Sequence, residues 1–172
     1  MKHIFQKLFT RAEPRAALVP LYRAVVAEAR QPDWYVHGAV ADTIDGRFDM
    51  VALILSLVLF RFEALGAQAA ESSALLTEVF VNDMDGALRE RGVDYTMGKH
   101  IGKMMSALGG RLGAYREARH DVQALGEALV RNLYRGEAPS AAALAFAVAR
   151  TRDIDARISA ASFESLRSGS LD

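Results

Sequence analysis

The residues that could do chemistry in this sequence are few, and their spacing does not bring them together. The four histidines, at positions 3, 37, 100 and 120, never form an H-x-x-x-H or H-x-x-E pair, so no helical face presents two metal ligands. There is no cysteine, which excludes disulfides, thiolate metal sites and a cysteine nucleophile. The sequence also has no G-x-S-x-G elbow and no phosphate-binding loop. We therefore predict no catalytic residue, no metal site and no cofactor, and expect a binding protein and not an enzyme.

The acidic residue that stands out is Asp83. A projection of residues 72–91 at about 100° per residue places Asp83 on the apolar side of a helix and Asp85 on the opposite side. A carboxylate buried without a partner costs several kcal/mol, so we expect a base from another element to reach it, with Arg47 and Arg111 as candidates. The alternative is that local irregularity turns Asp83 outward.

Composition indicates one helical domain as the scaffold for these residues. The chain has 172 residues, of which 51% are hydrophobic and 24% charged, the balance of a single packed domain. Ala and Leu are abundant, there are four prolines, and apolar residues recur at helical spacing. We predict an all-α fold: a single compact multi-helix domain over residues 1–172, with about six to eight helices and no strand.

The centre of the fold should be the helix that Asp42–Asp45 caps and that continues to Gly66. Its residues 50–62 are apolar nearly all the way round, which indicates burial on every side. The continuous apolar stretch is shorter than the roughly 20 residues that cross a bilayer. Later helices should start near Ser72, at Thr96, after His120 and after Pro139-Ser140, and we expect residues 165–172 to fray.

Three other segments each allow two interpretations: residues 1–12, residues 34–35 and the helix that follows Thr96. Residues 1–12 form an amphipathic pattern with Lys2 and Lys7, which either docks on the fold or attaches to an anionic membrane surface. Trp34 and Tyr35 lie in an expected loop and either cover the core or contact a partner.

The helix that follows Thr96 has an apolar stripe with Lys99 and Lys103 on the opposite side, facing solvent or a partner. Glycines lie on one flank of this helix, although each costs about 1 kcal/mol relative to alanine in a helix interior. Either a neighbouring backbone approaches them closely or the segment opens for a partner. These glycines are Gly98, Gly102, Gly109 and Gly113.

Charge is unevenly distributed in a chain whose net charge is zero. Residues 62–87 carry five acids and no Lys or Arg, whereas residues 88–120 carry seven Lys or Arg and three acids. The purely structural interpretation is that an acidic helix packs against a basic one. We expect no nucleic-acid partner, because a basic surface for phosphates needs more charge than this.

Three ordered stretches resemble a known family. They are Asp42–Met50, then Asn82–Asp85 running to Arg89–Val93, then Met97–Lys99 with Gly110–Leu112 and Tyr115. Over roughly residues 21–135 the chain resembles the ubiquinol-cytochrome c chaperone family. Two departures from the family pattern are Ile54, where a histidine is expected, and Leu108-Gly109, where an aromatic pair is expected.

The resemblance implies a helical assembly chaperone with no catalytic activity. Its partner would be cytochrome b, or its nascent chain, during biogenesis of the ubiquinol-cytochrome c reductase complex, with a peripheral membrane contact and a small partner protein as further candidates. The lack of a presequence suggests a bacterial, cytoplasmic member, near the inner membrane face. Candidate partner-binding or family-motif residues are Trp34, Tyr35, Asp45, Gly46, Arg47, Phe48, Asp83, Asp85, Arg89, Gly98, Lys99, Lys103, Arg111 and Tyr115.

Specific roles follow for some of these residues as hypotheses. Asp45 and Arg47 would fix the start of the central helix, and Asp83 would hold the helix over residues 72–91 to a basic neighbour. Lys99, Lys103 and Arg111 would present positive charge to a client. A rival function is a helical carrier or sensor of a lipid, quinone or haem, with a pocket at Met97, Met104 and Met105. A second rival is an enzyme with an unrecognised site around Asp83 and Arg111.

Overall fold

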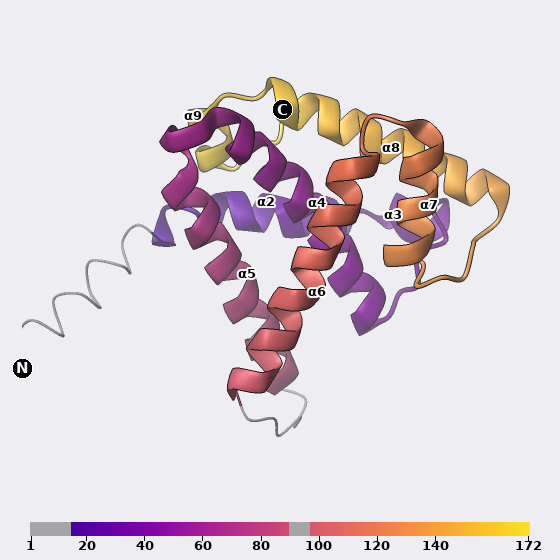
Figure 1. The fold of residues 1–172 in the computed structure, drawn as a ribbon, viewed down its shortest axis with the longest axis horizontal. Helices are drawn as coiled ribbons and strands as arrows, with labels where there is room; N and C mark the ends of the chain where they lie inside the picture. Colours follow the sequence, from indigo (N-terminus) through magenta and orange to yellow (C-terminus); the bar gives the residue numbers. More distant parts are fainter. Residues whose placement is uncertain (1–14, 90–96) are drawn as a thin grey trace, which may run out of the picture.

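The long apolar segment forms the central helix of the fold. A computed structural model of the chain, which describes residues 15–89 and 97–172, has helix α4 at Ile44–Leu65, with every residue from 50 to 60 buried (Figure 1). Thr43 caps its N terminus by accepting a hydrogen bond from the Gly46 N–H, and Gly66 ends it at φ 67°. The predicted central helix, its capping segment and its glycine stop are confirmed.

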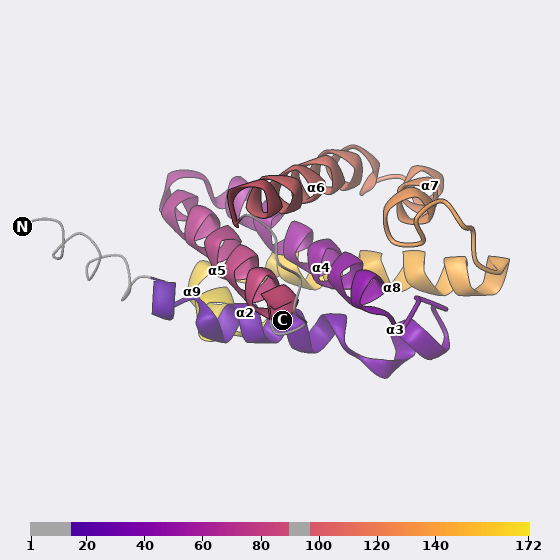
Figure 2. The ribbon, with the colours of Figure 1, turned by 90° about the horizontal axis from the view of Figure 1, so that it is seen from below.

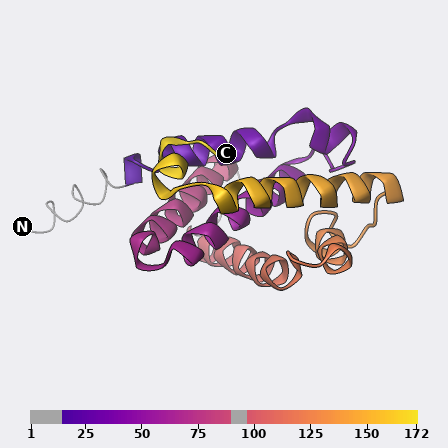
Figure 3. The ribbon, with the colours of Figure 1, turned by 90° about the horizontal axis from the view of Figure 1, so that it is seen from above.

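The other long helices surround α4 and bury its apolar sides. Helix α2 (Val19–Ala29) and helix α6 (Met97–Ala118) lie on opposite sides of α4 (Figure 2), and helix α8 (Ala141–Ala160) runs along a third side (Figure 3). Helix α5 (Ala70–Arg89) follows α4 through a short 3-10 turn, η1 (Gly66–Gln68), and packs back against it. Residues 15–89 and 97–172 form helices and no strand, so the all-α prediction is confirmed.

Three shorter helices complete the described part of the chain. Helix α7 (Val122–Asn132) packs between α6 and α8, and helix α9 (Phe163–Ser168) packs on α2. Helix α3 (Pro32–Val36) occupies the segment that we expected to be a loop. Proline at the first position of α3 lacks the N–H that would be unpaired there, which explains why a helix begins at a residue that usually interrupts one.

Helix α4 and the turn after it are long and apolar enough to cross a membrane, judged by length and composition alone. The mean hydropathy of the most apolar window in Ile44–Gln68 is 2.0, and 67% of that window is buried inside the fold. The flanking helices therefore cover this segment as the core of the domain, as predicted.

The expectation that residues 165–172 fray is wrong. Leu166 is fully buried, and Leu171 is 9% exposed. Gly169 ends α9 in a left-handed conformation close to Pro20, and Arg157 binds Asp172 at 2.6 Å. The helical pattern of this segment is weak, but α9 packs on α2 and buries Leu166, which fixes the segment on the fold. The amphipathic segment 1–12 lies outside the described residues.

Candidate functional site

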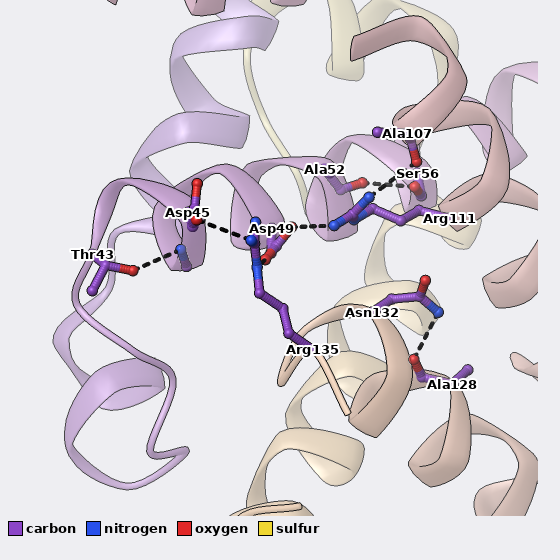
Figure 4. Close-up of polar contacts among 11 residues, drawn as sticks. Thr43, Asp45, Asp49, Ala52, Ser56, Ala107, Arg111, Ala128, Asn132 and Arg135 are labelled. Atoms are coloured by element: carbon purple, nitrogen blue, oxygen red, sulfur yellow. Dashed lines mark hydrogen bonds and ion pairs between the residues drawn. The ribbon is translucent and has the colours of Figure 1, made fainter. Parts of the chain in front are cut away.

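The strongest polar feature of the fold is a buried carboxylate, Asp49, in the second turn of α4. Its side chain is fully buried, and two arginines bind it from different elements (Figure 4). Arg111 of α6 donates from Nη2 to Oδ1 at 2.5 Å, and Arg135, just after α7, donates from Nε to Oδ2 at 2.6 Å. Arg135 also binds Asp45 in the first turn of α4 at 2.9 Å. The Asp49 carboxylate thus connects three elements that are far apart in the sequence.

Electrostatics at Asp49 reflect a competition between burial and pairing. Burial raises the pKa of Asp49 above its ordinary value, while hydrogen bonds and charge from Arg135 and Arg111 oppose that rise. The raised pKa of Arg135 has its largest cause in the hydrogen bond to the same carboxylate. Each arginine is therefore a compensating charge for a group that would otherwise be costly to bury.

Two buried tyrosines belong to the same part of the core. The Tyr115 hydroxyl is fully buried and has no hydrogen-bond partner among the described residues, and burial raises the pKa of this tyrosine well above its ordinary range. Tyr134, next to Arg135, donates to the Gly38 carbonyl oxygen at 2.6 Å. Arg135 has φ 54° and Gly136 has φ 90°, so a left-handed turn places Arg135 beside α4. This arrangement suits a rigid connection between helices.

The prediction that Asp83 is a buried acid paired with Arg47 or Arg111 is wrong. Asp83 is exposed at the edge of a groove between α2 and α5, where the Tyr22 hydroxyl donates to it at 2.8 Å. Arg47 instead binds Asp42 at 2.7 Å on the surface, and Arg111 binds Asp49. The alternative that Asp83 turns outward is correct: its side chain is exposed, although Tyr22 of α2 reaches it.

Asp45 and Arg47 both stabilise the start of α4, although by different contacts. Asp45 lies in the first turn, where an acid is favourable to the helix dipole, and it binds Arg135. Gly46 is required for packing, since a Cβ there would overlap the Ala41 carbonyl oxygen. The ring of Phe48 packs on the ring of Phe80, with the two ring centroids 5.7 Å apart. These residues of the first family stretch have structural roles in this fold.

Trp34 does not offer its ring to a partner. It is fully buried, its Nε1 donates to the Glu28 carbonyl oxygen at 3.1 Å, and the Arg150 guanidinium lies over its ring. Tyr35 is partly exposed and donates from its hydroxyl to the Ala29 carbonyl oxygen. The reading of both residues as a cover on the core fits these contacts, and the hypothesis of an exposed Trp34 is wrong.

The outward face of α6 is the least covered part of a long helix. Lys103 is exposed on this face. Met105, about 200° further round the helix, keeps 42% of its surface exposed and lines a groove beside α5. A Cβ added at Gly102, Gly109 or Gly113 would meet no atom of the described residues within 4 Å, so the interpretation that a neighbouring backbone packs closely on these three glycines is wrong. The N-terminal half of α6 extends with the C-terminal half of α5 beyond the other helices (Figure 1). The side chains of Asp85, Arg89 and Lys99, and any packing at Gly98, lie outside the described part.

Acidic and basic segments do meet, but mainly through α4. Helix α5 packs next to α6, and an ion pair between the two charge segments joins Glu63, at the end of α4, to Arg116 of α6 at 2.5 Å. Glu78 of α5 binds Arg15 instead. Both of these pairs are substantially exposed, and such pairs contribute little to stability.

Comparison with known proteins identifies the family that has this fold. A family model described as the ubiquinol-cytochrome C chaperone matches residues 36–171. The chain belongs to the ubiquinol-cytochrome c chaperone family. The match continues past residue 135, where the sequence resemblance ended, and includes α8 and α9. No curated protein matches the chain.

A solved member of this kind supports the family assignment. The crystal structure of the Cbp3 homolog from Brucella abortus is 29% identical to the chain, with a TM-score of 0.79. The alignment covers 96% of this chain and 93% of that one, so the likeness extends over nearly the whole fold. Within this chaperone fold, Asp49 is a functional candidate to which sequence reasoning assigned no role, although it lies inside the first family stretch. A charged residue in a helix that is apolar all round is the signal that could have singled it out.

Proposed function

We propose that this chain is an assembly chaperone that binds the cytochrome b subunit while the ubiquinol-cytochrome c reductase complex is built. The observation that carries the proposal is the family match over residues 36–171, together with the near full-length likeness to the Cbp3 homolog. We further propose that it is a bacterial protein, that it acts at the cytoplasmic face of the inner membrane, and that it does so by binding and not by catalysis.

The surface that we propose for the client is the outward face of α6, in its projecting N-terminal half. Lys103 adds positive charge there, and the open glycines on one flank of the helix allow another backbone to come close. Lys99 lies one turn before Lys103 on the same helix, and we assign it to the same surface. A membrane subunit with apolar helices and acidic connecting loops would be complementary to this combination.

Co-purification from cells tests the function and the surface separately. The tagged full-length chain is expressed with the cytochrome b subunit, recovered in mild detergent, and the recovered subunit is quantified by immunoblot. We expect the wild-type chain to retain cytochrome b, and Lys99→Glu with Lys103→Glu to reduce recovery at least about fivefold, because two attractive charges become repulsive. Thermal unfolding should be nearly unchanged, since Lys103 is exposed.

The matched control reverses the same number of charges elsewhere. Arg23→Glu with Arg30→Glu changes an exposed residue of α2 and the exposed residue at its C-cap, and should leave recovery unchanged. If the wild-type chain recovers no cytochrome b, the proposed function fails. If it recovers the subunit but the two lysine substitutions have no effect, or the α2 control has the same effect, only the α6 surface fails.

A further inference from the structure

A second surface of the molecule is hollow and apolar, and it lies away from the projecting half of α6. Helices α7 and α8 line an open groove of about 730 Å³. Gly126 lies at the floor, where an added Cβ would make an ordinary van der Waals contact, 3.7 Å from a Val148 methyl group. Val122 at one edge keeps 53% of its surface exposed. The apolar lining residues are Val122, Gly126, Val130, Ala141, Leu144, Ala145, Val148 and Ala149.

Two arginines stand at the ends of this groove, and one acid, Glu127, lies between them. Helices α7 and α8 are antiparallel, because the short connection 133–140 joins them, Gly126 faces Val148, and Arg119 before α7 binds Asp155 of α8. Arg131 therefore lies at the end formed by the start of α8, and Arg152 lies at the opposite end. The distance along the groove is about 15 Å at a rise of about 1.5 Å per residue.

Both terminal arginines are exposed and form no ion pair within the described residues. Arg131 and Arg152 line the groove but make no salt bridge, in contrast to the arginines at 111, 119, 135 and 150. The acid between them, Glu127, accepts a hydrogen bond from Gln123 at 3.2 Å. The groove thus combines an apolar floor with a guanidinium group at each end.

We propose that this groove binds an amphipathic helix of a partner protein that carries an acidic side chain at each end of a span of about three turns. Acids about 11 residues apart lie on the same face of a helix and about 16 Å from each other, which matches the groove. The apolar stripe between them would cover Val122, Leu144 and Val148, in the helix-in-groove mode of recognition. This inference goes beyond the proposed function, because it assigns a surface other than the outward face of α6.

Charge complementarity favours an acidic partner helix over two other occupants, the N-terminal segment of this chain and a second copy of it. The amphipathic N-terminal segment of the same chain carries Lys2, Lys7 and Arg11, so it would bring like charges to the two arginines. A second copy offering its own α7–α8 face would oppose the apolar floor with the same two arginines and only one acid. A helix with two acids is complementary to the groove at both ends.

The test uses a designed probe and the full-length chain. The probe is a fluorescently labelled peptide of about 18 residues with a leucine stripe and glutamates at two positions 11 residues apart; a second peptide has lysines at those positions. We expect saturable binding of the glutamate peptide by fluorescence anisotropy, and on the order of tenfold weaker binding of the lysine peptide. Arg131→Glu with Arg152→Glu should reverse this preference.

Two substitutions that replace an alanine by glutamate test the apolar floor. Ala149→Glu places a charge in the groove at an exposed position and should weaken binding about tenfold, whereas Ala142→Glu, exposed on the same helix but outside the lining, should not. Equal binding of both peptides, or no effect of Ala149→Glu, overturns the proposal. It is also overturned if dodecanoate displaces the peptide and binds more tightly, which indicates a lipid groove, or if the chain forms dimers that Ala149→Glu dissociates.

Discussion

Arg135 reaches from the turn after α7 to Asp49 in α4, with Nε 2.6 Å from Oδ2 across 86 residues of sequence. The second partner of Asp49, Arg111, comes from α6, 62 residues away. The carboxylate is fully buried, whereas the side chains of Arg111 and Arg135 are 15% and 48% exposed. The arrangement therefore neutralises an acid in the core with bases that keep some contact with solvent.

Replacing Asp49 by Asn should destabilise the fold by about 3 kcal/mol, because it leaves two guanidinium groups facing a neutral amide at a buried site. We place the value at the low end of the range for broken buried pairs, since Arg135 is half exposed. Urea unfolding measures the difference. Asp83→Asn is the matched control, and its exposed side chain predicts a loss below about 1 kcal/mol. Equal effects of the two substitutions would contradict the assignment of Asp49 as the buried acid.

The two core tyrosines should respond differently to loss of their hydroxyl groups. Tyr134→Phe removes a hydrogen bond to the Gly38 carbonyl oxygen and should cost about 1 kcal/mol or more. Tyr115→Phe removes a buried hydroxyl that has no partner among the described residues, so the free energy of unfolding should stay the same or increase. Urea unfolding of the two variants, each compared with wild type, decides this. A large loss for Tyr115→Phe would mean that its hydroxyl has an unseen partner.

The central helix could be predicted from sequence because its signals are local. Residues 50–62 are apolar, Thr43 is a good capping residue, and Gly66 adopts a conformation that favours glycine. Family membership could also be predicted, because the three stretches keep their order. These properties do not depend on which helices are neighbours.

The position of the buried acid could not be predicted, because it depends on the neighbours. A helical projection shows which side of α5 is more apolar, but it does not show that α2 leaves Asp83 at the edge of a groove. For α4 the projection has no polar side, so it could not show which helices Asp49 faces, although a charge beside an apolar segment is itself a signal. The prediction that a buried acid is paired with Arg111 holds for Asp49 and not for Asp83, the acid that the projection indicated.

High pH should destabilise the protein through its buried tyrosines. Burial raises the pKa of Tyr134 to about 12, and it also raises the pKa of Tyr22 and Tyr115 above the ordinary value. The unfolded chain releases these protons near pH 10, so the stability that protonated tyrosines contribute is complete below about pH 10 and is lost as pH rises towards the folded pKa.

For Tyr134 alone, this loss amounts to about 1.3 kcal/mol between pH 9 and pH 11. Urea unfolding at the two pH values measures it, and absorbance of the phenolate form reports the titration. Tyr134→Phe should lose less stability over this interval than wild type. Titration of all tyrosines near pH 10 in the folded protein would contradict the burial of these rings.

The C-terminal segment should contribute to stability as part of the core. Leu166→Ala removes a fully buried side chain between α9 and α2 and should cost about 2–4 kcal/mol. Arg167→Ala, at an exposed neighbouring position, is the control and should change little. Thermal and urea unfolding check both variants. A negligible effect of Leu166→Ala would restore the expectation that this tail frays.

The glycines of α6 distinguish a structural requirement from a functional one. A Cβ at Gly109 would meet nothing within 4 Å, so Gly109→Ala should stabilise the fold by about 1 kcal/mol through its effect on helix propensity. Gly46→Ala should do the opposite, because its Cβ would overlap the Ala41 carbonyl oxygen. Denaturant unfolding measures both signs.

The same variants then enter the cytochrome b co-purification. If a client backbone approaches α6 closely, Gly102→Ala and Gly109→Ala reduce recovery of cytochrome b although the protein is more stable, since the added methyl groups hold the client away. Gly86→Ala, in α5, also has open space at its Cβ, so it provides a control with the same chemical change. Unchanged recovery in all three variants would mean that the glycines serve opening of the α6 segment or have no role in client binding. A loss confined to the α6 variants would place the client next to these glycines, because no contact within residues 15–89 and 97–172 requires glycine there.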